Sequence, residues 1–404
     1  MYDFILRFIF VILQIPLFNN KYQKWVKGQK NIFNQIKKKS TKRIWFHCAS
    51  IGEYENIKPL ILKLKTGRNK IFVSFFSQSA LSQFKDYDLV DQTSFLPLDT
   101  ENNMKIFIDL INPKLVIISK NEIWPNMIQS INKKKIPIFS VGLKLKKSKI
   151  KRFLNRKFYT KHLNSFSYIF CQDIDTYNFL IKNNIYQCML MFDLRIEQII
   201  NDKLRSSKNH IISSFIQNKT TIVYGSLEKN DFEKITKFIK DRNDLKHIVV
   251  PHEIKSSQIN YLIKKIGNNY CYYSKISTEN IPIHKSILIV DVFGLLKHLY
   301  NYSSISYVGG GFDKGVHNTI EPAIYGNFLI FGPKHQDFKE TNYFIKNDVA
   351  EVVKNKSEFE KVISMLLVKK NSNSENIKKI SSFIKNNNNT SNIIIDKICE
   401  ICEI

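Results

Sequence analysis

Residues 304–323 read SISYVGGGFDKGVHNTIEPA: an apolar run, then a glycine-rich loop, then the start of a helix. Gly309, Gly310 and Gly311 can bring backbone amides close to a phosphate, and a helix N-terminus adds partial positive charge. The loop has neither the GxGxxG pattern nor the Lys-Ser/Thr end of a Walker loop, which disfavours NAD and ATP chemistry. The stretch predicts a nucleotide phosphate site, with Glu321 accepting hydrogen bonds from a ribose diol. A plain glycine turn before a capped helix is the alternative.

Short apolar runs alternate with amphipathic stretches on both sides of this loop. Such alternation is typical of buried parallel strands with covering helices. A polar, strand-poor stretch from about residue 201 to 219 separates two series of runs. We therefore predict an α/β protein with two Rossmann-like domains, whose ligands bind at the carboxyl ends of the strands. The expected strands are 44–50, 70–76, 114–119, 136–142 and 168–172, then 221–226, 247–251, 286–291, 304–310 and 328–333.

Length and composition agree with two folded domains. The chain has 404 residues, of which 43% are hydrophobic and 24% charged, so general disorder, collagen and coiled coil are excluded. The formal charge of +27 invites a nucleic-acid interpretation. However, Lys and Asn are spread along the whole chain, and no nucleic-acid-binding motif accompanies them. We predict no nucleic-acid partner, since attraction to an anionic membrane explains the charge equally well.

The first 30 residues predict a membrane anchor. Residues 4–18 form an apolar run broken by Arg7 and Pro16, shorter than the roughly 20 residues of a usual span. A basic cluster follows it, which predicts that the rest of the chain stays on the cytoplasmic side, whether the run spans the bilayer or lies in its interface. A buried helix of the first domain is the alternative. The cluster consists of Lys21, Lys24, Lys27 and Lys30.

The stretch HCASIGEYE, residues 47–55, comes at the end of the first expected strand. Gly52 is expected to let the backbone turn tightly into the next helix. Glu53 then lies at the mouth of the site, where a carboxylate can act as a general base toward a substrate hydroxyl. The alternative is a first-turn residue that the helix dipole favours.

A second motif, NEIWPN at residues 121–126, follows the strand KLVIIS. Glu122, Trp124 and Asn126 suit a sugar or lipid headgroup, because a ring stacks while polar groups orient hydroxyls. Alternatively, Trp124 is a core aromatic and Pro125 only starts a helix. The nine His residues are dispersed without a metal-binding motif, so we predict no metal site.

Together with YGS at 224–226, DVFGLLKHLY at 291–300 and FGPKHQDF at 331–338, these motifs occur in the order found in a known family. The series resembles the Kdo (3-deoxy-D-manno-octulosonic acid) transferases of lipopolysaccharide synthesis, which have the GT-B fold. The resemblance extends to about Val353. It implies an inverting, metal-independent transfer of Kdo from the co-substrate CMP-Kdo to a lipid A precursor (lipid IVA), at the cytoplasmic face of the inner membrane and without a cofactor.

The resemblance also assigns roles by matching position. It implies that Glu53 is the base that activates the acceptor, and that Glu122 is a second important acidic residue nearby. The other expected acceptor-binding residues are Ser50, Gly52, Trp124 and Asn126. The expected donor-binding residues are Ser226, Pro251, His252, Gly309, Gly310, Gly311, His317, Asn318 and Glu321.

The expected domain plan has four parts: an anchor at 1–30, an acceptor-binding domain at 31–200, a linker at 201–219 and a CMP-Kdo-binding domain at 220–404. Two other functions stay open. One is a GT-B glycosyltransferase that uses a UDP- or GDP-sugar, and the other is an inactive GT-B relic with a membrane-assembly role. Donor identity separates the two enzymes, and turnover separates both from the relic.

Overall fold

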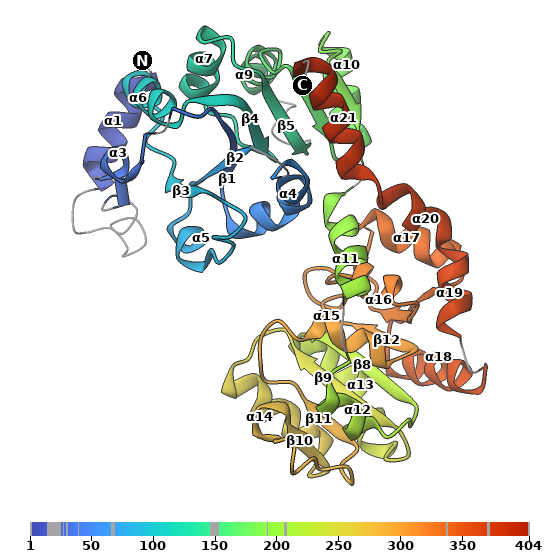
Figure 1. The fold of residues 1–404 in the computed structure, drawn as a ribbon. Coiled ribbons are helices and arrows are strands. Elements are labelled where there is room, and N and C mark those ends of the chain that lie inside the picture. Colours follow the sequence, from blue (N-terminus) through green and yellow to red (C-terminus); the bar gives the residue numbers. More distant parts are fainter. Residues whose placement is uncertain are drawn as a thin grey trace. The chain divides into compact units, whose positions relative to one another are not determined.

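The structure is a computed structural model in which the chain divides into two compact units (Figure 1). The first unit is Met1–Gln198 with Asn389–Ile404, and the second is Ile199–Asn388. The described residues are 2–13, 26, 28–29, 31–38, 40–65, 69–145, 153–191, 193–205, 208–336, 338–369 and 372–402.

The first unit is built on a parallel sheet of seven strands in the order β3-β2-β1-β4-β5-β6-β7. All six residues of β1 are buried, as expected of a strand covered on both faces. The chain reverses its direction of strand addition between β1 and β4, which makes their carboxyl ends the usual place for a ligand. The strands are β1 (Arg43–Cys48), β2 (Lys70–Phe75), β3 (Gln92–Phe95), β4 (Pro113–Ser119), β5 (Ile138–Leu143), β6 (Tyr168–Cys171) and β7 (Cys188–Leu190).

Helices cover both faces of this sheet. On one face, strand residues such as Trp45 share a buried core with helix residues such as Phe107 and Met127. On the other face, Phe46 shares a second core with helix residues such as Ile57. The two layers use opposite faces because neighbouring residues of a strand point in opposite directions. The helices are α1 (Tyr2–Leu13), α3 (Ile32–Gln35), α4 (Ile51–Leu64), α5 (Gln78–Gln83), α6 (Glu101–Ile111), α7 (Pro125–Lys133), α9 (Phe153–Leu163), α10 (Ile174–Lys182) and α21 (Thr390–Cys402). A further helix, α11 (Leu194–Arg205), begins in this unit and continues into the second, because the boundary falls after Gln198.

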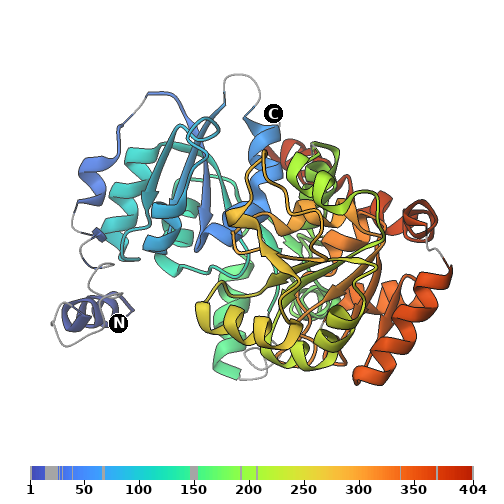
Figure 2. The same cartoon turned by 90° about the horizontal axis from the view of Figure 1, so that it is seen from below.

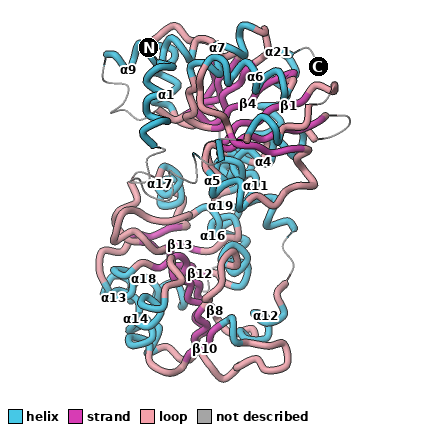
Figure 3. Tube along the Cα trace, turned by 90° about the vertical axis from the view of Figure 1, so that its left-hand side faces the viewer, coloured by secondary structure: helices cyan, strands magenta, loops and turns pink. Residues whose placement is uncertain are grey.

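The second unit has its own parallel sheet of seven strands, in the order β10-β11-β9-β8-β12-β13-β14. Figure 3 shows strands of this sheet as magenta segments among cyan helices. The strands are β8 (Thr221–Leu227), β9 (Lys246–Pro251), β10 (Tyr270–Tyr272), β11 (Ile287–Ile289), β12 (Ile305–Val308), β13 (Phe328–Phe331) and β14 (Ala350–Val352). The helices are α12 (His210–Ile216), α13 (Lys229–Asp241), α14 (Ser256–Ile266), α15 (Leu296–Leu299), α16 (Ile320–Ile324), α17 (Lys339–Lys346), α18 (Lys356–Lys369), α19 (Asn373–Lys379) and α20 (Ser381–Asn387).

The two parallel sheets confirm the predicted α/β class with two Rossmann-like halves. The unit boundaries differ from the expected plan at the C-terminus, because α21 packs on the first unit. Ile394 and Ile398 join the core of that unit, and the backbone N–H of Ser391 donates to the buried Glu197 at 2.8 Å. The expected linker also holds regular structure, since α12 lies within 201–219 and buries Phe215 in the second unit.

The N-terminal helix α1 is attached to the first unit by polar contacts, and it lies beside the N label in Figure 2. Tyr2 donates from its hydroxyl to Asp99 at 3.1 Å, and Asp3 accepts from the backbone N–H of Glu101 at 3.1 Å. No helix in the described ranges is long and apolar enough to cross a membrane. The predicted basic cluster at Lys21, Lys24, Lys27 and Lys30 lies outside the described residues.

Candidate functional site

Glu53 lies in the first turn of α4, directly after the central strand β1. The hydroxyl of Ser50 caps this helix by accepting from the backbone N–H of Glu53 at 3.3 Å. Glu53 Oε2 in turn accepts from the backbone N–H of Ala49 at 2.7 Å. Burial raises the pKa of Glu53, the N–H of Ala49 lowers it, and the charge of Glu122 raises it again; the net direction is upward. A carboxylate with a raised pKa is a stronger base than an ordinary glutamate, which suits proton abstraction.

Glu122 belongs to the same cluster. Its Oε2 accepts from Trp124 Nε1 at 2.9 Å and lies 3.9 Å from His47 Nε2. His47 is fully buried at the end of β1, with its Nδ1 2.9 Å from Ser74 Oγ. Its Nε2 has no hydrogen-bond partner, so it can interact with Glu122 or with a ligand there. Because β1 and β4 are neighbours, the structure brings Glu53 and Glu122 together.

His47 and Lys120 are residues to which the sequence analysis gave no role. Burial lowers the pKa of Lys120, and the nearby charge of Glu53 raises it. Lys120 directly follows β4 and has a left-handed backbone, with φ of 56°. The signal that could have found both residues is their position, because each stands at or next to the carboxyl end of a central strand.

Two expected acceptor residues have a different local role. The prediction that Gly52 makes a tight turn is wrong: the residue is helical, and an added Cβ would meet nothing closer than Ser50 Oγ at 3.9 Å. Asn126 donates from its side chain to Asp3 Oδ1 at 2.6 Å and to the backbone carbonyl of Asp99. Asn126 therefore joins α1 to α7, and its side-chain donors are used within the chain.

A hollow of about 560 Å³ lies beside α1, between α7 and α9. Its lining combines apolar side chains such as Phe158 with basic ones such as Lys133 and Lys161. Asn126 is also at its edge. The mixture suits a ligand that has both apolar and anionic parts.

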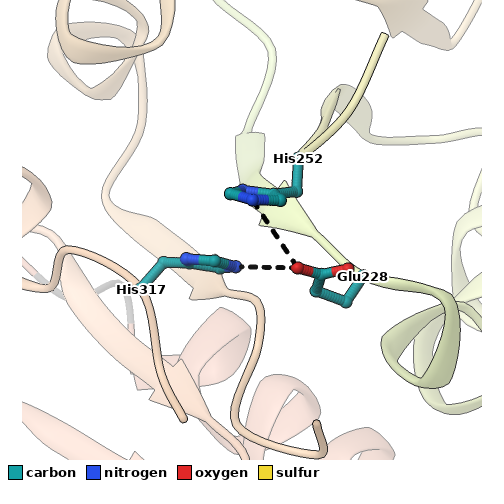
Figure 4. A group of neighbouring side chains, drawn as sticks. All are labelled: Glu228, His252 and His317. Carbon is teal, nitrogen blue, oxygen red and sulfur yellow. Dashed lines mark ion pairs between the residues drawn. The ribbon is translucent and has the colours of Figure 1, made fainter. Parts of the chain in front are cut away.

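In the second unit, the loops after β8, β9 and β12 bring three side chains together (Figure 4). Glu228 Oε1 lies 3.7 Å from His252 Nε2 and 3.4 Å from His317 Nε2. The two imidazoles are stacked, with ring centroids 4.2 Å apart and an interplanar angle of 17°. Burial and His252 lower the pKa of His317, while Glu228 and Asp313 raise it; the net direction is downward.

The glycine loop packs tightly against its own neighbours. The backbone N–H of Gly309 donates to the carbonyl of Gly225 at 2.9 Å, and that of Gly310 donates to Asp231 Oδ2 at 2.8 Å. A Cβ at Gly309 or Gly311 would collide with backbone, of Ser226 and of Gly332 respectively. Glycine is needed here for close approach, and the amides of Gly309 and Gly310 are used within the chain, contrary to the expectation that they face a phosphate.

Of the remaining expected donor residues, Ser226 and Pro251 lie at the carboxyl ends of β8 and β9, whereas Asn318 and Glu321 lie just before and within α16. Ser226 has a left-handed backbone with φ of 54°, and Pro251 ends β9 opposite Leu227. Asn318 Oδ1 accepts from the backbone N–H of Ile320, the first residue of α16, at 3.0 Å, and the N-cap of this helix is Thr319. Burial raises the pKa of the half-buried Glu321 to about 7.

Residues 25–196 match a family model described as 3-deoxy-D-manno-octulosonic-acid transferase (kdotransferase). A transferase of that name from Aquifex aeolicus is 29% identical over 335 residues, which cover 81% of this chain and 87% of the relative. A 3-deoxy-D-manno-octulosonic acid transferase of Rickettsia typhi is 26% identical, covering 85% of this chain and 74% of the relative. A bifunctional glycosyltransferase/methyltransferase of Fusobacterium nucleatum is 26% identical over 95% of this chain, which spans 61% of that relative's length.

Solved structures share the fold. A UDP-GlcNAc 2-epimerase from Neisseria meningitidis has a TM-score of 0.62 at 13% identity, over 89% of this chain and 100% of that one. A glycosyltransferase from Rickettsia africae has a TM-score of 0.57 at 12% identity, over 89% of this chain and 99% of that one. At such low identity the likeness concerns the fold alone.

Proposed function

We propose that this relative of the Kdo transferases moves Kdo from CMP-Kdo to a lipid A precursor, lipid IVA. The matched family model and the named relatives confirm the resemblance to Kdo transferases and the prediction of an enzyme, a glycosyltransferase. The donor, the acceptor and the inverting course of the reaction are our proposal. Its main support within the chain is Glu53, held at the carboxyl end of a central strand next to Glu122.

In the proposed reaction Glu53 removes the proton from an acceptor hydroxyl. The hydroxyl oxygen then bonds to the anomeric carbon of Kdo while the bond to the CMP phosphate breaks, so the configuration inverts. General-base help of this kind typically contributes about 10² to 10⁴ in rate. The N–H of Ala49 holds one carboxylate oxygen, which leaves the second oxygen for the acceptor.

We assign donor binding to the second unit, around Ser226, Pro251, His252 and His317. Glu321, which has a pKa near 7, would accept hydrogen bonds from the ribose diol of CMP. Asn318 contributes by accepting from the backbone N–H groups of Ile320 and Glu321 at the start of the short helix α16. We propose that the transfer needs no cofactor or metal.

We further propose that α1 lies in the interface of the anionic inner leaflet, at the cytoplasmic face of the inner membrane. Phe4, Ile5, Phe8 and Val11 expose 73%, 46%, 59% and 61% of their surface and recur at helical spacing. The contacts of Asp3 and Asn126 fasten this helix to the start of α7, whose N-cap is Trp124. A lipid acceptor held at α1 would therefore be on the side of the sheet that carries Glu122.

The proposal is tested with the full chain, vesicles that contain lipid IVA, and one donor at a time. Mass spectrometry of the lipid should reveal an added Kdo with CMP-Kdo, and EDTA should leave the yield unchanged. If a UDP- or GDP-sugar is used as donor and CMP-Kdo is not, the result would favour the alternative of a GT-B glycosyltransferase with a different sugar donor. A folded chain that turns over none of these donors would favour the inactive relic. A strict requirement for Mg²⁺ would contradict the metal-independent course.

A further inference from the structure

We propose that His47 is a positioning residue of the first unit: a neutral imidazole, protonated on Nε2, that donates to Glu122 and so fixes this carboxylate beside Glu53. The assignment rests on the proposed function, because it gives His47 a part in the transfer through Glu122. The starting observation is a buried side chain with an unused atom. His47 is fully buried near the carboxyl end of β1, and its Nε2 has no hydrogen-bond partner within the described residues.

A chain of hydrogen bonds across two strands determines which ring nitrogen carries the proton. His47 lies opposite Ser74 of β2, and its Nδ1 is 2.9 Å from Ser74 Oγ. Trp45 Nε1 donates to the same Oγ at 2.8 Å, since an indole N–H has no acceptor site. In the part of the chain that the structure describes, Trp45 and His47 are the two partners of this hydroxyl. The hydroxyl proton of Ser74 therefore has His47 Nδ1 as its acceptor.

The contact with Ser74 in turn fixes the tautomer of His47. A neutral imidazole that accepts at Nδ1 carries its own proton on Nε2. The opposite tautomer would leave the buried hydroxyl proton of Ser74 without an acceptor, which is costly. His47 therefore presents a donor at Nε2, the atom that lacks a partner.

Glu122 is the acceptor within reach of this donor. Its Oε2 lies 3.9 Å from His47 Nε2 and already accepts from Trp124 Nε1 at 2.9 Å. The imidazole and the ring of Trp124 meet edge to face, with centroids 6.4 Å apart. The side chain of Glu122 is 22% exposed, so it has room to move. A shift of about 1 Å brings Oε2 within hydrogen-bond distance of Nε2.

Two ring N–H groups then hold one oxygen of Glu122. The charge of Glu122 raises the pKa of Glu53, so the place of this carboxylate affects the strength of the base. Trp45, Ser74 and His47 are all fully buried, and a buried chain of satisfied hydrogen bonds keeps the imidazole from turning. His47 thus acts through Glu122 without touching the substrate.

The direct test is NMR of the full chain with ¹⁵N-labelled histidine, at pH 8 and without substrate. The ring of His47, assigned through its backbone signals, should show the pattern of a neutral imidazole protonated on Nε2. In Glu122→Gln the Nε2 proton should move upfield, because an amide oxygen is a weaker acceptor than a carboxylate. Glu400→Gln, at an exposed carboxylate of the same unit, should leave it in place. A ring protonated on Nδ1, or an Nε2 proton unmoved in Glu122→Gln, would overturn the proposal.

Two substitutions of His47 test its part in the transfer. The side-chain nitrogen of Gln comes near the place of imidazole Nε2, whereas that of Asn comes near Nδ1. His47→Asn should therefore lower kcat/KM about tenfold or more, and His47→Gln should retain most of the activity. In a chain that carries Glu122→Gln, His47→Asn should cause little further loss, because the effects of two partners in one hydrogen bond are not additive.

The outcomes separate this inference from the proposed function. An equal loss from His47→Asn with and without Glu122 would show that His47 does not act through Glu122. The NMR comparison uses Glu122→Gln, a change at a half-buried side chain, so it decides the matter even if a variant of His47 does not fold. If the NMR result is as expected but no Kdo is transferred, the proposed function fails, and the hydrogen bond from His47 to Glu122 stands.

Discussion

Glu53 and Glu122 are two carboxylates in one cluster with different surroundings. Glu53 is bound by the backbone N–H of Ala49, and its pKa is raised by burial and by the charge of Glu122. Glu122 is bound by the indole N–H of Trp124. Neighbouring carboxylates in different surroundings commonly have separate roles in catalysis. This difference favours Glu53 as the base and Glu122 as the residue that adjusts it.

Glu122→Gln should shift the pH dependence of transfer. Because the charge of Glu122 raises the pKa of Glu53, its removal lowers that pKa, and the base is deprotonated at lower pH. The acid limb of the kcat/KM profile should therefore move to lower pH, while glutamine can still accept from Trp124. Glu400→Gln, at an exposed carboxylate of the same unit, should leave the profile in place. An acid limb that is unchanged or moves to higher pH in Glu122→Gln would show that the charge of Glu122 does not raise the pKa of Glu53.

Glu321 should make donor affinity depend on pH. Burial raises its pKa to about 7, so the carboxylate is mostly protonated below that pH and ionised above it. The ionised form is the better acceptor for ribose hydroxyls. Calorimetry should therefore show tighter CMP binding at pH 8 than at pH 6. Glu321→Gln should weaken binding at pH 8 by about 1 to 3 kcal/mol and remove most of the pH dependence. The same pH dependence in the variant would refute the assignment.

At the scale of elements, the glycine loop after β12 is stabilised by one carboxylate. The fully buried Asp231 accepts from Tyr307 OH at 2.7 Å, from Gly310 N–H at 2.8 Å and from Glu228 N–H at 2.9 Å. Asp231 thus joins α13, β12 and the loop. It also occupies the place at the Gly310 amide that the sequence had suggested for a phosphate.

Asp231→Ala should destabilise the second unit. Two buried donors and one half-buried donor lose their acceptor, and each unsatisfied buried group costs about 1 to 3 kcal/mol, partly offset by relaxation. We expect the free energy of unfolding in urea to fall by about 2 to 4 kcal/mol. Asp241→Ala, at the end of the same helix, should change it by less than about 0.5 kcal/mol. If Asp231→Ala and the unchanged chain have the same urea unfolding midpoint, Asp231 does not stabilise the glycine loop.

The apolar face of α1 should bind membranes. Phe4 and Phe8 are largely exposed, so replacing both by Ser leaves the fold of the unit intact. Burial of one large apolar side chain is worth about 1.5 to 3 kcal/mol, so the double variant should lose at least about tenfold in partition to anionic liposomes. As a control, Tyr87→Ser removes an exposed aromatic side chain elsewhere in the unit, and this variant should co-float with liposomes as the unchanged chain does. Unchanged flotation of the double variant would favour the alternative of a helix that belongs to the domain.

The sequence analysis predicted the inner strands of both sheets but missed the edge strands. β3, β7, β10 and β14 were missed, and these are the two edges of each sheet. They have three or four residues, several of them half-exposed, so they lack the continuous apolar run that marks the buried central strands. The central strands were found because burial on both faces demands such a run. Edge strands are specified by their pairing partner, which a single sequence does not display.

At the scale of the whole molecule, the first unit is built from two separate parts of the sequence, since the C-terminal segment belongs to it as well as the N-terminal half. The chain returns to the first unit through α21, whose Ile398 is fully buried there. An amphipathic C-terminal helix could be expected from the sequence, but not which sheet it would cover. The same limit applies to the site. Glu53, Glu122 and His317 were quoted from motifs, whereas the meeting of Glu228 with two imidazoles depends on which loops the second sheet places together.

The central claim is that Glu53 is the base of the proposed transfer. The most direct measurement is single-turnover transfer of Kdo from CMP-Kdo to lipid IVA in vesicles, followed by mass spectrometry, for the unchanged chain and Glu53→Gln. The account predicts that Glu53→Gln slows transfer by about 10² to 10⁴ while CMP affinity and the urea midpoint stay the same. Transfer by Glu53→Gln at the rate of the unchanged chain would contradict it.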